Sequence, residues 1–103
     1  MDYPVSIKTP LGRFSTVVEI EFKDDGTLLG EFEVMGLFST FSGRKVSGNN
    51  ILFNGVIDTP MGEIGYESEA SIDGKDFHGK AHSRIGELEF QPLIKSRKKT
   101  RKS

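Results

Sequence analysis

The sequence contains no cysteine among its 103 residues. The chain can therefore form no disulfide, no thiolate metal site and no cysteine nucleophile. It also lacks the roughly 18 consecutive apolar residues that a membrane-spanning helix needs, and its first residues do not show the basic and apolar segments of a secretory signal. These absences predict a cytoplasmic protein with no membrane span.

The motifs of the common enzyme classes are missing as well. There is no Ser-His-Asp order with an elbow signature, no phosphate-binding loop and no dinucleotide fingerprint. The two histidines, His78 and His82, are four residues apart on an alternating segment. On a strand this separation is about 13 Å, too far for one metal ion. We therefore expect no metal site, no cofactor and no catalytic group from these residues.

The net charge of −1 hides a strong asymmetry along the chain. Six of the fourteen basic residues lie near the C-terminus: Lys95, Arg97, Lys98, Lys99, Arg101 and Lys102. Residues 1–94 thus hold 8 basic side chains (14 − 6) against 15 acidic ones, a charge of about −7. An acidic body is unsuited to nucleic acid, which needs a basic face. We predict a single domain over 1–94 and a disordered basic tail over 95–103, the only segment able to attract an anionic partner.

The chain repeats one plan twice. Thr59-Pro60-Met61-Gly62 follows Thr9-Pro10-Leu11-Gly12 at an offset of fifty, and Gly86 follows Gly36 at the same offset. Asp73-Gly74 corresponds to Asp25-Gly26, and by this point the second copy is two residues shorter than the first. The repeated features are turn residues and strand patterns, so the sequence predicts a duplicated β unit with repeats at about 5–50 and 51–94.

Strict alternation of apolar and polar residues dominates the segments between these turns. The alternation predicts half-buried antiparallel strands, because successive side chains on a strand point to opposite faces. The facing of the segment 37–46 is ambiguous. The predicted inward residues are Phe14, Thr16, Val18, Ile20, Phe22, Leu28, Gly30, Phe32, Val34, Ile51, Phe53, Ile57, Ile64, Tyr66, Ser68, Ala70, Ile72, Phe77, Gly79, Ala81, Ser83 and Ile85.

Eight such strands, joined by short turns and with no helical period, are compatible with two all-β architectures. One is a small eight-stranded antiparallel up-and-down barrel built from two four-strand repeats. The other is an antiparallel β-sandwich. The barrel is favoured because consecutive hairpins pair sequential strands directly, and closure removes the exposed edges of an open sheet.

The ordered motifs resemble a group of small glycine-punctuated β-barrel modules of bacteria, over about residues 5–94. The residues that carry the resemblance are Thr9 to Gly12, Asp25-Gly26, Gly30, Gly36 with Phe38, Gly48-Asn49 through Phe53, Thr59 to Gly62, Asp73-Gly74, Gly79, Gly86 and Phe90. Such modules occur alone or appended to larger enzymes and have no assigned activity. The strand and turn pattern is also distantly similar to lipocalin and avidin barrels. The resemblance implies a barrel fold and leaves the function open.

The two repeats differ most at inward positions. Val18 and Ile20 in the first repeat correspond to Ser68 and Ala70 in the second, and Phe32 and Val34 correspond to Ala81 and Ser83. An eight-stranded barrel is just wide enough either to be filled by side chains or to hold one small ligand. A small apolar or amphipathic ligand would then bind in the lumen against five candidate residues. These residues are Tyr66, Ser68, Ala70, Ala81 and Ser83.

Three functional hypotheses follow from this asymmetry. The first is a ligand-binding module with a lumenal pocket. The second is an accessory or interaction domain with a filled core, which acts on a protein partner beside a larger enzyme. The third is a barrel enzyme of the isomerase or cyclase kind that works inside the lumen. In the filled alternative, bulky residues of the first repeat cross the barrel axis and occupy the space left by the small ones.

Overall fold

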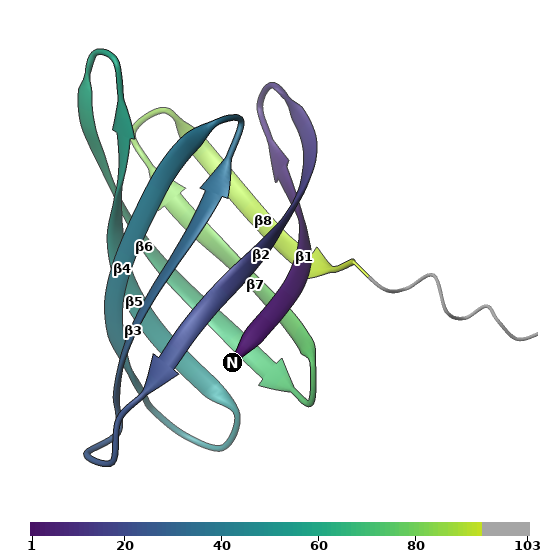
Figure 1. The fold of residues 1–103 in the computed structure, drawn as a ribbon, viewed down its shortest axis with the longest axis vertical. Coiled ribbons are helices and arrows are strands. Elements are labelled where there is room, and N and C mark those ends of the chain that lie inside the picture. Colours follow the sequence, from purple (N-terminus) through teal and green to yellow (C-terminus); the bar gives the residue numbers. More distant parts are fainter. Residues whose placement is uncertain (94–103) are drawn as a thin grey trace, which may run out of the picture.

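The computed structural model describes residues 1–93, and these residues form strands and turns without any helix (Figure 1). The strands are β1 (Asp2–Thr9), β2 (Gly12–Phe22), β3 (Thr27–Val34), β4 (Leu37–Lys45), β5 (Asn50–Thr59), β6 (Gly62–Asp73), β7 (Asp76–Ser83) and β8 (Gly86–Pro92). The described residues include no helix long and apolar enough to cross a membrane. The predicted tail, 95–103, lies outside this part of the chain.

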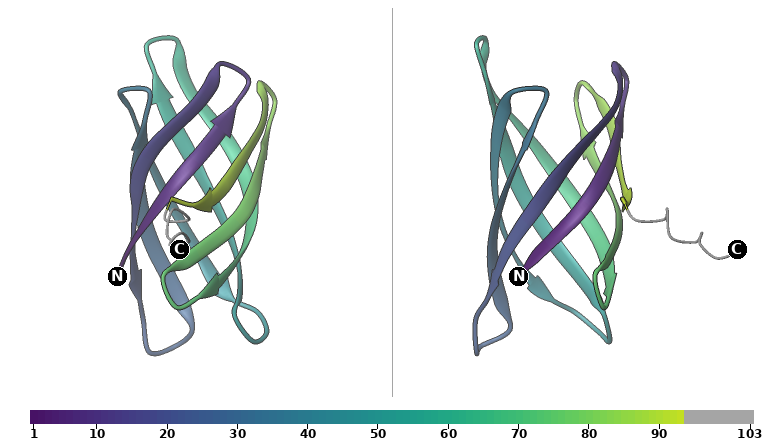
Figure 2. Two further views of the ribbon diagram at one scale, coloured as in Figure 1. Left: turned by 90° about the vertical axis from the view of Figure 1, so that its right-hand side faces the viewer. Right: turned by 45° about the vertical axis from the view of Figure 1, so that its right-hand side comes forward.

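The eight strands close into one antiparallel barrel in which each strand pairs with its neighbours in sequence. Closure is made by β1 and β8, with Val5 opposite Pro92 and Lys8 opposite Glu89. The two views in Figure 2 show the tilted strands wrapping around a common axis. The prediction of an eight-stranded up-and-down barrel is confirmed, and the sandwich alternative is wrong because the sheet is a single closed surface.

Alternation along the strands decides which side chains form the core. In β3, Leu28, Phe32 and Val34 are buried while the residues between them are exposed or half-buried. The same period settles β4, whose facing the sequence leaves ambiguous. Ser39 and Phe41 point into the barrel and Phe38 is 46% exposed. The core therefore lies inside the barrel.

The turns fall at two ends of the barrel. Four hairpins, β1–β2, β3–β4, β5–β6 and β7–β8, lie at the upper end in Figure 1, and the three remaining connections lie at the lower end. Asp25-Gly26 and Asp73-Gly74 both belong to the lower end, between β2 and β3 and between β6 and β7. The first connection is longer, since Lys23 bonds to Thr27 around three residues, whereas Asp73 pairs directly with Asp76.

One predicted equivalence between the repeats is wrong. Gly36 is a central residue of the β3–β4 turn, between the paired residues Val34 and Leu37, whereas Gly86 is itself paired with Ser83. Gly86 thus takes the position that Gly12 and Gly62 take in the two Thr-Pro turns. When Gly36 is aligned with Gly86, the β3–β4 turn begins one residue later than the β7–β8 turn, at Val34 instead of the residue aligned with Ser83.

Ile85 is also placed differently from its prediction. It was expected inside the barrel, but it is 55% exposed. The inward alternation of β7 ends at Ser83, where the hairpin begins, and Ile85 is the third residue of that turn. A turn residue no longer follows the period of the strand before it.

Candidate functional site in the barrel interior

The five candidate residues lie side by side on β6 and β7. The register places Ser68 opposite Ala81 and Tyr66 opposite Ser83. Tyr66, Ser68, Ala70 and Ala81 are buried, whereas Ser83 is half-buried at the end of its strand. The alternation therefore brings four of the five residues to the inner wall, and places Ser83 at the upper mouth.

Tyr66 is held by a residue that the sequence did not single out. Its hydroxyl lies 2.7 Å from the hydroxyl of Ser39, which has no exposed surface. The ring is also close to Gly55, where an added Cβ would lie 2.5 Å from the Tyr66 hydroxyl oxygen. Burial raises the pKa of Tyr66 to about 12, although the hydrogen bond with Ser39 acts in the opposite direction. Tyr66 is therefore a protonated phenol at neutral pH with its hydroxyl already paired.

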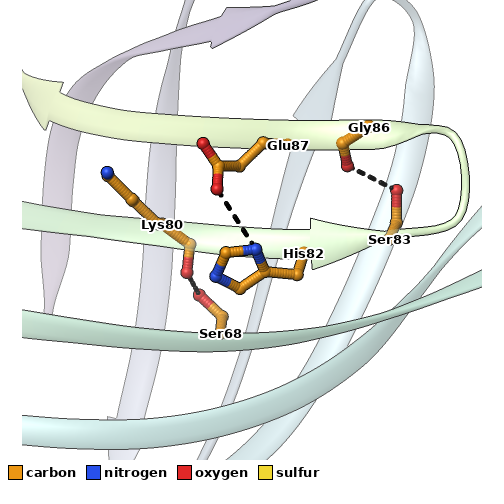
Figure 3. A network of polar contacts seen from close by, with 6 residues as sticks. All are labelled: Ser68, Lys80, His82, Ser83, Gly86 and Glu87. Atoms are coloured by element: carbon orange, nitrogen blue, oxygen red, sulfur yellow. Dashed lines mark hydrogen bonds and ion pairs between the residues drawn. The ribbon is translucent and has the colours of Figure 1, made fainter.

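The hydroxyls of both candidate serines bind backbone groups (Figure 3). Ser68 donates to the carbonyl oxygen of Lys80 at 2.7 Å. Ser83 donates to the carbonyl oxygen of Gly86 at 2.9 Å and accepts from the backbone N–H of Ile85 at 3.3 Å. These bonds join neighbouring strands and close the β7–β8 turn. All three polar side chains proposed to face a ligand therefore have protein partners.

Seven aromatic rings form a connected network inside the barrel. Phe32 on β3 packs against Phe90 on β8 with centroids 5.6 Å apart, and against Tyr66 on β6 at 6.4 Å. Phe53 on β5 reaches Phe90 at 6.4 Å. These strands are not neighbours in the sheet, so the contacts cross the interior. The complete set is Tyr3, Phe32, Phe41, Phe53, Tyr66, Phe77 and Phe90.

The small residues of the second repeat lie where strands and rings approach closely. A Cβ on Gly79 would come within 2.6 Å of the Ala70 Cβ and of a β6 carbonyl oxygen. Ala81 has no exposed surface, and Ser68 is paired in register with Phe53. Phe77 and Phe90, which flank this region, pack edge to face at 5.5 Å. The small side chains therefore leave room for the bulky side chains beside them.

The outer wall of β6, β7 and β8 carries two rows in which a histidine or lysine stands between two glutamates. In one row His82 stands between Glu67 and Glu87, and in the next Lys80 stands between Glu69 and Glu89. The His82 Nδ1 lies 3.2 Å from a carboxylate oxygen of Glu87 (Figure 3), and both side chains are more than half exposed. Within residues 1–93 no group of three or more histidine, aspartate and glutamate residues could hold a metal ion.

An exposed feature that the sequence analysis did not identify lies at the upper end of the barrel. Each of the four hairpins there presents one apolar side chain at its tip: Leu11 at 78% exposure, Met35 at 36%, Met61 at 94% and Ile85 at 55%. We call these four residues the apolar rim. The signal was available in the sequence, because large apolar residues are uncommon at the centre of tight turns.

Comparison with protein-family models, with curated proteins and with solved structures gives no match for this chain.

Proposed function

We propose that this chain is an interaction module whose barrel interior is structural and whose function lies on its outer surface. The observation that carries the proposal is the aromatic network across the lumen. Phe32 and Phe53 reach Phe90 from strands that are not its neighbours, so side chains occupy the space that a ligand would need. This arrangement corresponds to the accessory-domain hypothesis.

The polar groups of the inner wall support the same function. A lumenal site orients its ligand through a few polar groups that converge on it. Tyr66, Ser68 and Ser83 instead bond to Ser39 or to the backbone, and a ligand would have to replace these bonds. The surface hollows are lined by outward-facing residues such as Glu69, Glu31, Leu29 or Glu67, and two of them also reach candidate residues, Ala70 in one and Tyr66 with Ser83 in the other.

Enlarging an inner-wall residue tests whether the lumen is filled. We expect Ala81→Phe to destabilise the protein by about 1–3 kcal/mol, because the new ring must displace packed neighbours. Ala70→Ile should act in the same direction. His82→Phe, on the outer face of the same strand, is the matched control and should change the free energy of unfolding by less than about 0.5 kcal/mol. Denaturant midpoints measure all three.

A fluorescent apolar probe provides the second measurement. We expect that any binding of anilinonaphthalene sulfonate to the folded wild type persists in Ala81→Phe. A stabilising Ala81→Phe substitution, combined with probe binding that this substitution removes, would refute a filled interior and favour the lumenal ligand site.

A further inference from the structure

The two ends of the barrel differ in the chemistry of their turns. The lower end has polar tips, formed by Asp24-Asp25-Gly26, Ser47-Gly48-Asn49 and Gly74-Lys75. The upper end carries the apolar rim, with one large apolar residue on each of its four hairpins. The rim therefore gathers four large apolar residues at one end of the barrel, whereas the described connections at the other end expose one, Val46 at 41%.

In three of the rim turns, a hydroxyl side chain bonds one backbone N–H and one backbone carbonyl of the turn. The Thr9 hydroxyl accepts from the Leu11 N–H and donates to the Gly12 carbonyl, with both distances 3.0 Å. Thr59 makes the same pair of bonds in the Met61 turn, and Ser83 makes them in the Ile85 turn. Backbone groups that are already bonded lower the cost of taking a turn out of water. These tips are thus suited to an apolar medium.

The rim consists of separate protrusions. Figure 1 shows four distinct hairpin tips at this end, with the β5–β6 hairpin that carries Met61 projecting farthest. Four side chains on the narrow end of a barrel expose much less than the ~800 Å² per partner of a standard protein interface. A protein partner would also have to provide a socket for each tip. A lipid layer accommodates separate protrusions without such complementarity.

The charges beside the rim divide it into two halves. Lys8, Arg13 and Arg84 lie on the β7–β8–β1–β2 side, which also carries one acidic residue, Glu87. Glu33, Asp58 and Glu63 lie on the β3–β6 side, and Asp58 and Glu63 form a cross-strand pair. A zwitterionic headgroup layer presents both phosphate and ammonium groups and can complement both halves. A purely anionic layer would repel the acidic half and the acidic body.

We propose that the apolar rim docks this domain onto a zwitterionic lipid surface, with Met61 and Leu11 entering the interface and the charged residues beside them meeting the headgroups. The inference rests on the proposed surface-acting function and names its partner. Binding by a few side chains predicts weak, reversible association.

The absence of tryptophan allows a direct test, since a single introduced tryptophan reports its own surroundings. In the full chain, Met61→Trp should shift its emission to the blue when phosphatidylcholine vesicles are added. Leu29→Trp, on an outward position of β3 that is 46% exposed, is the matched control and should not shift. Co-sedimentation with the same vesicles should fall roughly tenfold for Met61→Ser and again for the double variant Leu11→Ser/Met61→Ser, but not for Leu29→Ser.

Each contrary result has a defined meaning. Equal emission shifts in both tryptophan variants, or no vesicle binding by the wild type, would overturn the lipid proposal. Binding only to phosphatidylglycerol vesicles and its loss in high salt would assign the attraction to residues 95–102 and overturn it too. A blue shift that depends on protein concentration without vesicles, together with a dimer in sedimentation, would assign the rim to self-association. The denaturant midpoint of Ala81→Phe does not depend on any of these results. The filled interior and the lipid proposal can therefore fail independently of each other.

Discussion

The two halves of the barrel each contain four strands but place their bulky side chains at different inward positions. The first repeat, β1–β4, contributes bulk from Val18, Ile20 and Phe32, whereas the second, β5–β8, has Ser68, Ala70 and Ala81 at the corresponding positions. Phe32 passes across the axis to Phe90. The small residues at these positions therefore provide room for the ring of Phe32, while four of the seven rings come from other positions of the second repeat.

The largest expected effect comes from removing the bulk that crosses the axis. Phe32→Ala should lower the free energy of unfolding by about 3–5 kcal/mol, since it leaves a cavity that the small second-repeat residues cannot fill. Phe38→Ala, on the outer face of the adjacent strand at 46% exposure, should change it by less than about 1 kcal/mol. Urea unfolding of both variants measures the difference. Similar small losses in both would show that the repeats pack independently.

High pH should destabilise the protein through the buried phenol of Tyr66 on β6. The pKa of Tyr66 is about 12 in the fold because of its burial, against 10 for an ordinary tyrosine. Between these values the unfolded chain loses the proton and the folded chain keeps it, so stability falls as the pH rises from about 10 to 12. The full loss is about 2–3 kcal/mol. Chemical unfolding at several alkaline pH values should reveal this slope.

Two phenylalanine variants separate the contributions to that slope. Tyr66→Phe should remove most of the loss between pH 10 and 12, because no titrating group remains beside Ser39. Burial also raises the pKa of Tyr3, so Tyr3→Phe is the matched control, and it should leave the Tyr66 component in place. An unchanged slope in Tyr66→Phe would show that the phenol has the same pKa in the folded and unfolded chains, which contradicts its burial.

Much of the fold could be predicted because it depends on local patterns. The period of two in segments such as β2 and the turn residues of Thr9–Gly12 fix strands and hairpins, and consecutive hairpins define the closed barrel. The facing of β4 was harder, because Ser39 is a polar residue at an inward position. Its burial depends on Tyr66, 27 residues away, and pairing at that distance leaves no local signal.

The candidate site shows the same limit. The facing of Tyr66, Ser68, Ala70 and Ala81 follows from alternation along β6 and β7. Whether these residues border a pocket depends on the rings that cross from other strands, which alternation does not specify. The apolar rim was missed for a different reason: each tip is a single residue, and only the shared end of the barrel brings the four together.

The smallest expected effect concerns the turns in which the repeats differ. Met35 has a φ of 56°, the only positive value among the described non-glycine residues, beside Gly36 at 76°. This left-handed conformation favours glycine or asparagine. Met35→Gly should therefore stabilise the protein by about 0.5–1 kcal/mol. The thermal midpoint provides a sufficiently precise measurement.

The corresponding hairpin of the second repeat, β7–β8, should respond to glycine in the opposite way. Ile85 lacks a positive φ, so Ile85→Gly only adds freedom to the unfolded chain and should destabilise the protein by about 0.5–1 kcal/mol. Changes of the same sign in Met35→Gly and Ile85→Gly would contradict the difference between the two turn geometries.

The closing pair of strands has a consequence for the order in which the barrel assembles and opens. The other seven strand pairings join hairpin neighbours, but β1 and β8 must bring Val5 to Pro92 from opposite ends of the described chain. This pairing has four residue pairs, whereas β5 and β6 share ten. Its long loop closure and short ladder make it the slowest contact to form and the first to separate. Amide protons of the β1–β8 ladder should exchange with solvent faster than those of β5–β6, through partial openings that leave the hairpins intact.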